Sequence, residues 1–390
     1  MSLSNFRIVD STLREGEQFA HAHFTSAQKK QIALALDAFG VEYIEMTNPS
    51  ASPASFEDAR MVVGLGLRAR VLVHCRCTLA DAERAVATGT QGVNVLFGTS
   101  EQLRKHSHGR SIEEIIDSAR EVITYLQGQG VETRFSCEDA FRTPLETLLQ
   151  VYTAVDVLGV DRVGIADTVG VADPLQVYEV VSALRSAVGA DIEFHGHNDS
   201  GCAIANAYAA LRAGATHIDT TILGIGERNG ITPLGGLIAR LYATDRSLVS
   251  RYNLPQLQHL DHLVSDLTCV PIPFNNYVTG ETAFSHKAGL HAKAVLSDPS
   301  SYEALDPADF GLERRLEVGH RLTGWNVVAH RAVSLGLGLS ECQVRAATME
   351  IKRLADAGPL SQDRVDEVLR RWPGGYLGSR VEEGARTWAQ

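Results

Sequence analysis

Short apolar runs alternate with longer helical patterns from the N-terminus to residue 241, and this alternation constrains the fold more than any other feature. Helical periodicity separates the runs, for example over 25–39 and 111–127. Eight strand–helix units predict a (β/α)8 TIM barrel, whereas an open doubly wound sheet shares the local pattern and is the alternative. The predicted strands cover residues 6–10, 43–46, 70–75, 92–97, 131–136, 161–167, 191–197 and 217–223. Glycines suited to helix C-caps follow several helices, namely Gly40, Gly130, Gly159 and Gly214.

The character of the sequence changes after residue 245. Residues 271–291 carry Asn, Gly and aromatic side chains without clear periodicity, and residues 338–372 again indicate helices. We therefore predict a catalytic barrel over residues 1–245. Residues 246–390 are predicted to form a linker and an appended, partly helical region.

Charge and composition exclude several partners. The 36 Lys and Arg residues against 47 Asp and Glu give a net charge of -11, which argues against nucleic acid or an anionic membrane surface as a partner. No apolar run approaches the length of a membrane span, and six cysteines are too few for a disulfide scaffold. The start, MSLSNFRIVD, lacks the pattern of a secretory signal, so we expect a cytoplasmic enzyme or binding protein.

The stretch DIEFHGHND, residues 191–199, carries three possible metal ligands in alternation. Glu193, His195 and His197 would project from one face of a strand. A mixed set of carboxylate and imidazole ligands suits one divalent metal ion, with Zn, Mn, Co, Fe or Mg as candidates. Two histidines at this spacing also occur in strands that bind no metal.

Further polar residues follow other predicted strands at the end where TIM barrels carry their active sites. Taken singly, each could be an ordinary buried or solvated residue, but their convergence favours an active site. A metal there could polarise the carbonyl of a 2-oxo acid, with Arg14 beside the alkoxide and Arg134 with Ser136 on a distal carboxylate. The glycine-rich run at 224–236 could approach a phosphate or simply close the barrel. The candidates are Arg14, Glu15, Gln18, His74, Asn94, Arg134, Ser136, Glu138 and Thr168.

Four motifs together resemble one known family. They are DSTLREGEQ (10–18), EFHGHND (193–199), GIGERNGITPLGG (224–236) and FNNYVTGETAFSHKAGLHAKA (274–294). These motifs are similar to those of the homocitrate synthases of lysine biosynthesis. Those enzymes are metal-dependent barrel acyltransferases related to isopropylmalate, citramalate and Re-type citrate synthases. The resemblance spans roughly residues 5 to 330 and implies condensation of acetyl-CoA with 2-oxoglutarate, followed by thioester hydrolysis.

The resemblance also implies residue roles. Glu15, His195 and His197 fall on the metal ligands, and Arg14 falls on the arginine beside the reacting carbonyl. In this family a histidine of the partner subunit, here His291, enters the site, so we expect a homodimer or a higher homo-oligomer. It acts in proton transfer with the residues at positions Glu138 and Tyr302. The remaining matches hold or line the substrate pocket: Gln18, His74, Arg134, Ser136, Thr168 and Glu193.

One position departs from the family. Residue 94 is Asn where the lysine-pathway enzymes have an Asp expected to meet the ammonium of inhibitory lysine. The amide predicts weak inhibition by lysine, and it leaves oxaloacetate or 3-phosphonopyruvate open as alternative acceptors. A lyase of the same barrel family and a non-catalytic metal-binding protein are further alternatives.

Overall fold

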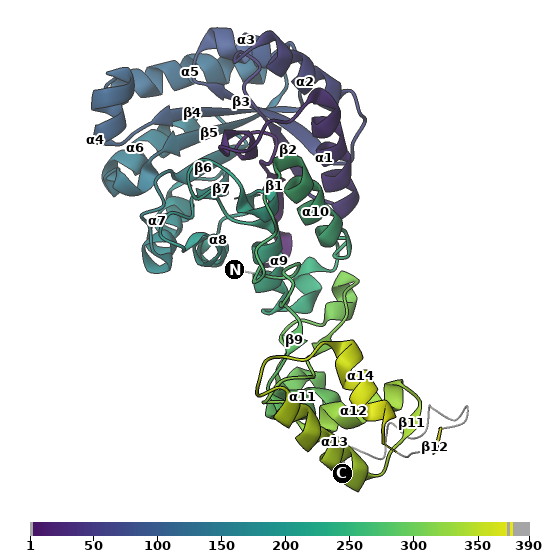
Figure 1. Ribbon diagram of the computed structural model, residues 1–390. Helices are drawn as coiled ribbons and strands as arrows, with labels where there is room; N and C mark the ends of the chain where they lie inside the picture. Colours follow the sequence, from purple (N-terminus) through teal and green to yellow (C-terminus); the bar gives the residue numbers. More distant parts are fainter. Residues whose placement is uncertain (1–2, 373–374, 377–390) are drawn as a thin grey trace. The chain divides into compact units, whose positions relative to one another are not determined.

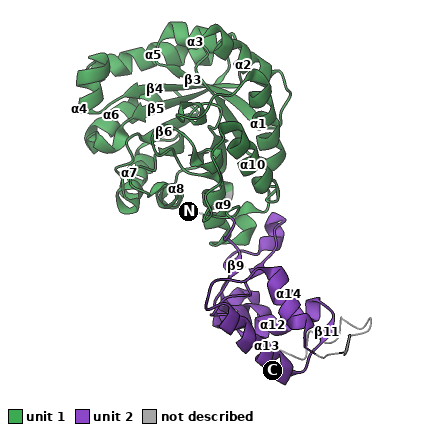
Figure 2. Cartoon of the chain, viewed as in Figure 1, with its two compact units in different colours: residues 1–280 green, residues 281–390 purple. Residues whose placement is uncertain are grey.

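The computed structural model describes residues 3–372 and 375–376, in two compact units, residues 1–280 and 281–390 (Figure 2). The first unit extends beyond residue 245, where the change in composition placed the end of the barrel. Helix α10, Gln256–Thr268, packs against α1, Ser26–Phe39, and is therefore part of this unit.

The first unit is a closed barrel of eight parallel strands (Figure 1). The first strand pairs with the last, with Ile8 opposite Ile218, and this pairing closes the sheet. The predicted TIM barrel is confirmed, and the open sheet is excluded. The strands are β1 Arg7–Asp10, β2 Tyr43–Met46, β3 Arg70–Arg76, β4 Gly92–Gly98, β5 Glu132–Glu138, β6 Arg162–Asp167, β7 Asp191–Gly196 and β8 His217–Thr220.

Helices surround the barrel, and their ends carry clear signals. Thr25 and Ser111 form capping boxes at the starts of α1 and α5, and Gly40 and Gly214 end α1 and α8 with left-handed φ angles of 104° and 113°. These ends agree with the predicted helices. Besides α1 and α10, the helices are α2 Pro53–Val63, α3 Leu79–Val86, α4 Glu101–Leu103, α5 Ile112–Gly128, α6 Leu145–Asp156, α7 Pro174–Ala187, α8 Ala203–Ala213 and α9 Leu234–Tyr242.

The barrel interior is charged as well as apolar. Arg134 on β5 pairs across the interior with Glu193 on β7, with Nε and Oε1 2.7 Å apart. A small apolar cluster of Val9, Tyr43 and Leu72 lies in the same interior. Buried charges are stable only when paired, so the strands hold these side chains at fixed positions.

The second unit is mainly helical, as predicted for the appended region. Its core is built from α12, α13 and α14, with Val328, Ala347, Ile351 and Leu369 almost fully buried. The elements are α11 Gly289–Ser297, α12 Trp325–Ser334, α13 Glu341–Leu354 and α14 Gln362–Arg370, with two short sheets that pair β9 Ser285–His286 with β10 Arg315–Leu316, and β11 Leu337–Gly338 with β12 Gly375–Tyr376. Among the described residues, no helix has the length and apolar character needed to cross a membrane.

Candidate active site

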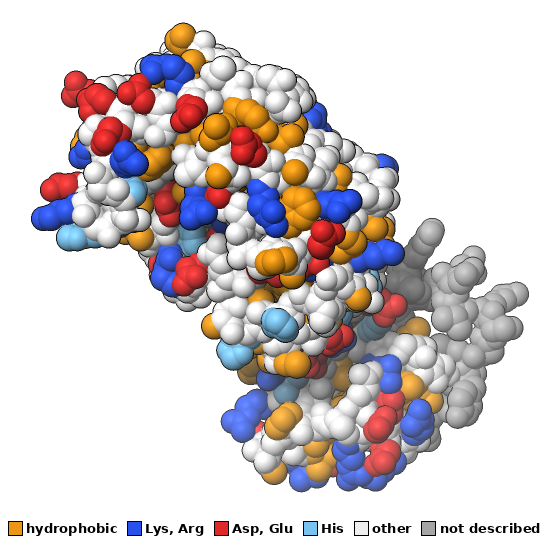
Figure 3. All heavy atoms as spheres, turned by 90° about the horizontal axis from the view of Figure 1, so that it is seen from above, with side chains coloured by type: hydrophobic (Ala, Val, Ile, Leu, Met, Phe, Trp, Pro, Cys, Tyr) orange, Lys and Arg blue, Asp and Glu red, His pale blue; other side chains and the backbone are white. Residues whose placement is uncertain are grey.

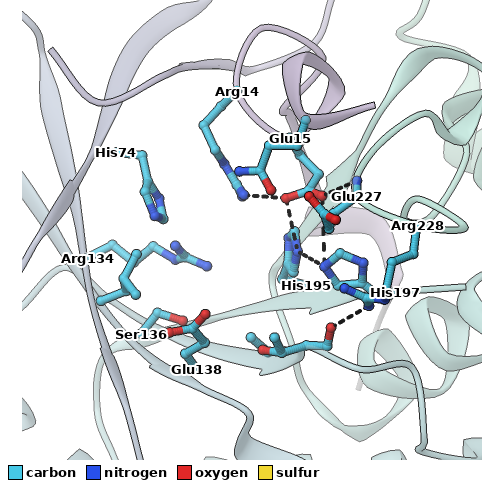
Figure 4. A pocket seen from close by; sticks show the side chains of 14 residues that line it. Arg14, Glu15, His74, Arg134, Ser136, Glu138, His195, His197, Glu227 and Arg228 are labelled. Atoms are coloured by element: carbon cyan, nitrogen blue, oxygen red, sulfur yellow. Dashed lines mark hydrogen bonds and ion pairs between the residues drawn. The ribbon is translucent and has the colours of Figure 1, made fainter. Parts of the chain in front are cut away.

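A cavity of about 230 Å³ opens at the carboxyl end of the barrel strands (Figure 4). Figure 4 shows Glu15, His195 and His197 on one side of this cavity, and His74, Arg134, Ser136 and Glu138 on the other. Its polar lining therefore has two halves. The lining residues are Arg14, Glu15, Gln18, His74, Leu96, Arg134, Ser136, Glu138, Ala166, Thr168, His195, His197, Glu227 and Arg228.

Glu15, His195 and His197 form a possible metal site. Each offers one ligand atom, and these atoms all lie within 4.8 Å of one another. The Nε2 atoms of the two histidines are 3.3 Å apart, and they lie 4.0 and 3.9 Å from the Glu15 oxygens. Ligand atoms about 2 Å from a shared ion are separated by about 3 to 3.5 Å, so this set fits one divalent cation after a small contraction.

The protonation states suit a cation. Burial lowers the pKa of His195 and of His197 to about 4, with a further contribution from the Arg14 charge at His195. Burial alone would raise the pKa of Glu15, but the charge of Arg14 holds it below its ordinary value. Two neutral imidazoles and one carboxylate are therefore the forms present at neutral pH, and these are the forms that bind metals.

Neighbouring groups hold these ligands in place. Asp219 Oδ2 lies 2.8 Å from His195 Nδ1, which leaves Nε2 of that ring directed at the site. The backbone N–H of Glu227 donates to Glu15 Oε1 over 2.9 Å. A Cβ at Gly226 would come within 2.9 Å of the same oxygen. The glycine-rich run thus closes over Glu15 and positions it.

Arg14 is fixed by two carboxylates. Its Nε donates to Glu45 Oε2 over 2.7 Å, and its Nη1 donates to Glu15 Oε2 over 2.5 Å. Glu45 is fully buried and also contacts His74 and Asn94, with Nδ1 of His74 3.3 Å and Nδ2 of Asn94 2.6 Å from Oε1. Burial would raise the pKa of Glu45, but the Arg14 charge and His74 keep it well below its usual range. Glu45 is therefore ionised, and it holds the side chains of Arg14, His74 and Asn94 together beneath the cavity.

The opposite half of the cavity holds the cation Arg134. The guanidinium of Arg134 passes against Gly164 of β6, where a Cβ would lie 2.5 Å from Nε. Glycine is required at residue 164 because any side chain would displace this guanidinium. The Ser136 hydroxyl donates to the carbonyl of the same glycine over 3.1 Å. Arg134, Ser136 and Glu138 all line the cavity, and burial together with the charge of Asp139 raises the pKa of Glu138.

Four sequence candidates lie elsewhere. Asn94 and Glu193 are fully buried and are absent from the cavity lining, because they sit deeper in the barrel. Burial raises the pKa of Glu193 to about 8 despite its contact with Arg134. His291 and Tyr302 belong to the second unit, where both are exposed and their rings stack with centroids 4.2 Å apart.

Sequence reasoning missed Glu45, Asp219, Glu227 and Arg228. Glu45 and Asp219 each stand inside a short, otherwise uncharged buried strand core, and that contrast could have identified them. Glu227 contributes through its backbone N–H. Arg228 donates to the carbonyl of Thr168. The Glu227 contact leaves no signal in residue type, because any residue but proline offers the same N–H, whereas the Arg228 contact is made by its guanidinium.

Comparison with known proteins assigns the family. Residues 5–264 match the HMGL-like family, and residues 278–359 match the homocitrate synthase post-HMGL domain-like family. The chain is 57% identical to the mitochondrial homocitrate synthase of Schizosaccharomyces pombe, over 95% of this chain and 89% of that protein. It is 52% identical to the cytosolic isozyme of Saccharomyces cerevisiae, over 95% and 87%. An HMG-CoA lyase structure from Bacillus subtilis superposes with a TM-score of 0.62 over 69% of this chain and 96% of that chain, and at 21% identity it shows the fold alone.

The same comparison corrects the predicted subcellular location and confirms the family resemblance. The prediction of a cytoplasmic location is wrong. Relatives of similar identity from Schizosaccharomyces pombe, Yarrowia lipolytica and Saccharomyces cerevisiae are named mitochondrial, and a second Saccharomyces cerevisiae relative is named cytosolic. The family is therefore found in both compartments. The predicted resemblance is confirmed over nearly the whole chain, and the protein belongs to the HMGL-like family and, within it, to the homocitrate synthases.

Proposed function

We propose that this protein condenses acetyl-CoA with 2-oxoglutarate and hydrolyses the resulting thioester, giving homocitrate and free CoA. The observation that carries the proposal is the two-sided cavity, with Glu15, His195 and His197 facing Arg134 and Ser136. A 2-oxo dicarboxylic acid has matching halves: an oxo acid group that can chelate a cation, and a distal carboxylate. Identity to curated homocitrate synthases over 95% of the chain supports the same acceptor.

Glu15, His195 and His197 would hold one divalent ion, with zinc, manganese, cobalt or magnesium as candidates. When bound, such an ion acts as a Lewis acid that polarises the keto group of the acceptor. Arg14, fixed between Glu15 and Glu45, would face the oxygen on which negative charge develops. Because its guanidinium is already oriented, little reorganisation is needed as that charge forms.

The opposite half would select the acceptor. Arg134 and Ser136, with His74 and Thr168, would bind the distal carboxylate through charge-assisted hydrogen bonds. Gln18 lines the same cavity beside the cation half. Glu193 and Asn94 would act from beneath, through Arg134 and Glu45. The comparisons give no support to oxaloacetate or 3-phosphonopyruvate as the acceptor.

Proton transfer from the acetyl methyl group needs a base, because that methyl is a weak carbon acid. Glu138 lines the cavity, and burial raises its pKa toward the range useful in acid–base catalysis. The family resemblance adds His291 and Tyr302, entering from the partner subunit of a homodimer. The carbanion formed would attack the keto carbon, and water would then release CoA from the thioester.

Free-CoA release tests the proposal directly. Purified protein loaded with each candidate metal would be mixed with acetyl-CoA and 2-oxoglutarate, oxaloacetate, 2-oxoisovalerate or 3-phosphonopyruvate. We expect the highest kcat/KM with 2-oxoglutarate, homocitrate as the product, and loss of activity on addition of a chelator. Higher efficiency with another acid, or no CoA release with any, would overturn the proposal.

A further inference from the structure

A basic segment follows β4 at the same end of the barrel as the cavity. Residues 104–110, RKHSHGR, hold three Lys or Arg and two His without an acid, and no other seven-residue window of the sequence holds three Lys or Arg. In a chain of net charge -11, this is a strong local excess. Figure 3 shows acidic and basic side chains interspersed on the face it draws, with no broad basic surface there.

The segment lies at the end of the barrel where the cavity opens. Strand β4 contributes Leu96 to the cavity lining, and Gly98 at its end stands opposite Glu138 in the register with β5. The backbone N–H of Thr99 donates to the carbonyl of Glu138 over 3.1 Å. Only a few residues separate this point from Arg104, so the basic segment begins close to the carboxyl end of β4, the end of the barrel at which the cavity opens.

The local backbone holds the segment in a defined shape. Residues Arg104–His108 form a π-helical turn, a rare conformation that recurs at functional sites. Nε2 of His108 lies 2.9 Å from the carbonyl oxygen of Gly98, and its ring packs edge-on against Phe97. This anchoring fixes the turn on β4 while Lys105 and His106 remain exposed.

The cations of the segment have few competing partners. No described residue forms an ion pair or hydrogen bond with the side chain of Lys105, and Arg104 Nε is buried without a hydrogen bond. Arg110 makes an exposed ion pair with Glu114 at 3.3 Å, a contact of little net strength that an anion can replace. Such cations, on a fixed turn, suit a multiply charged phosphate ligand.

We propose that the turn at residues 104–110 binds the phosphate groups of the acetyl-CoA substrate. This rests on the proposed function, which places the thioester beside Arg14 and Glu138. The pantetheine arm separates the thioester from the 3′-phosphate and the diphosphate, so these groups must lie outside the cavity, on its rim. Lys105 and Arg110 then provide a local concentration of positive charge in a chain whose net charge is -11.

The test compares variants of the turn on two acetyl donors. Lys105→Gln with Arg110→Gln should raise the KM for acetyl-CoA about tenfold, which corresponds to about 1.4 kcal/mol, and leave the KM for 2-oxoglutarate unchanged. With S-acetylpantetheine, which has no phosphates, the double variant should match the wild type. Arg120→Gln is the control, because Arg120 is also exposed and paired on α5, with Asp117 at 2.6 Å.

The outcomes separate this inference from the proposed function. An unchanged KM for acetyl-CoA, or an equal rise with both donors, would overturn the phosphate site while leaving the condensation intact. Absence of acetyl-CoA turnover in the wild type would overturn the proposed function. Calorimetric titration of CoA and of 3′-dephospho-CoA tests the site without turnover: equal affinity of the wild type and the double variant for both ligands would also overturn it.

Discussion

The side-chain amide of Asn94 donates a hydrogen bond to Oε1 of Glu45 over 2.6 Å, and both side chains are fully buried. Glu45 in turn orients Arg14 through Oε2. The amide thus stabilises the carboxylate that positions the arginine at the cavity. An aspartate at residue 94 would instead place two carboxylates in contact inside the barrel.

Asn94→Asp should therefore lower the free energy of unfolding by about 1–3 kcal/mol at pH 8. Contact between the two acids raises the folded-state pKa of both carboxyl groups. In the wild-type protein, by contrast, Arg14 and His74 hold the pKa of Glu45 well below its usual range. A group with a raised folded-state pKa stabilises the protein below its unfolded-state pKa, and this contribution is lost as the pH rises. Urea unfolding at several pH values should show the deficit shrinking toward pH 5, whereas a constant deficit would refute this account.

Lysine should bind weakly to the wild-type protein. The neutral amide of Asn94 offers no countercharge for the lysine ammonium, and Glu45 is already paired with Arg14. In the Asn94→Asp variant, the ammonium would neutralise the additional carboxylate. Thermal unfolding with and without lysine should show a clear rise in Tm for the variant and little for the wild type. Equal shifts in the two proteins would exclude this role for residue 94.

His195→Ala should abolish both metal retention and turnover. The change removes one of the two neutral imidazoles and leaves Glu15 and His197, which are too few ligands for tight binding. Metal content after gel filtration would be measured by mass spectrometry. His259→Ala, an exposed histidine on α10, is the control and should retain metal. Activity near that of the wild type with bound metal would disprove the ligand assignment.

Asp219→Asn should weaken metal binding without unfolding the protein. Asp219 lies 2.8 Å from Nδ1 of His195, so the change disturbs the tautomer and orientation of that ring. We expect about a 10- to 100-fold rise in the Kd of the metal-free protein for zinc or manganese, measured by competition with a chromophoric chelator. Asp10→Asn is the matched control, because Asp10 is also buried but contacts Thr12 and Thr220. The assignment fails if both variants bind metal equally well.

The order of strands and helices could be predicted from sequence because periodicity and caps are local signals. The eighth strand was predicted too long: it ends at Thr220, since residues Ile222–Gly224 form a 3-10 turn in which Leu223 has a φ angle of 58°. The run 217–223, HIDTTIL, is rich in β-branched residues and ends on two apolar ones, and residue type of this kind does not reveal a reversal of the backbone.

The depth of side chains in the barrel could not be read from alternation. Glu193 and His195 do share a face, but Glu193 stands about 7 Å further from the strand end, where it meets Arg134 and Arg162. Glu193 is therefore too deep to join the two histidines. Glu15, from the loop after β1, lies beside them instead, and only the family resemblance indicated this pairing. The contacts of Glu45 likewise depend on which strands face each other across the closed barrel.

His291→Ala should reduce kcat by about 10²- to 10⁴-fold while leaving 2-oxoglutarate binding nearly intact, as expected for loss of a general acid or base. His291 is exposed and stacks on Tyr302, so its removal should not unfold the second unit. Calorimetry would measure oxo acid binding to the metal-loaded variant. His330→Ala, an exposed histidine of the same unit, is the control.

Mixed oligomers test whether His291 acts across subunits. Neither His291→Ala nor Glu138→Gln should be active alone. A heterodimer of the two has one site with both wild-type residues if His291 enters from the partner, and none if it acts within its own subunit. Co-expression with two affinity tags would isolate that heterodimer. Recovery of up to about half of wild-type activity is the expected result, because one of its two sites is then complete. No recovery of activity would contradict the action of His291 across subunits. Loss of oxo acid affinity in His291→Ala would contradict its role in proton transfer.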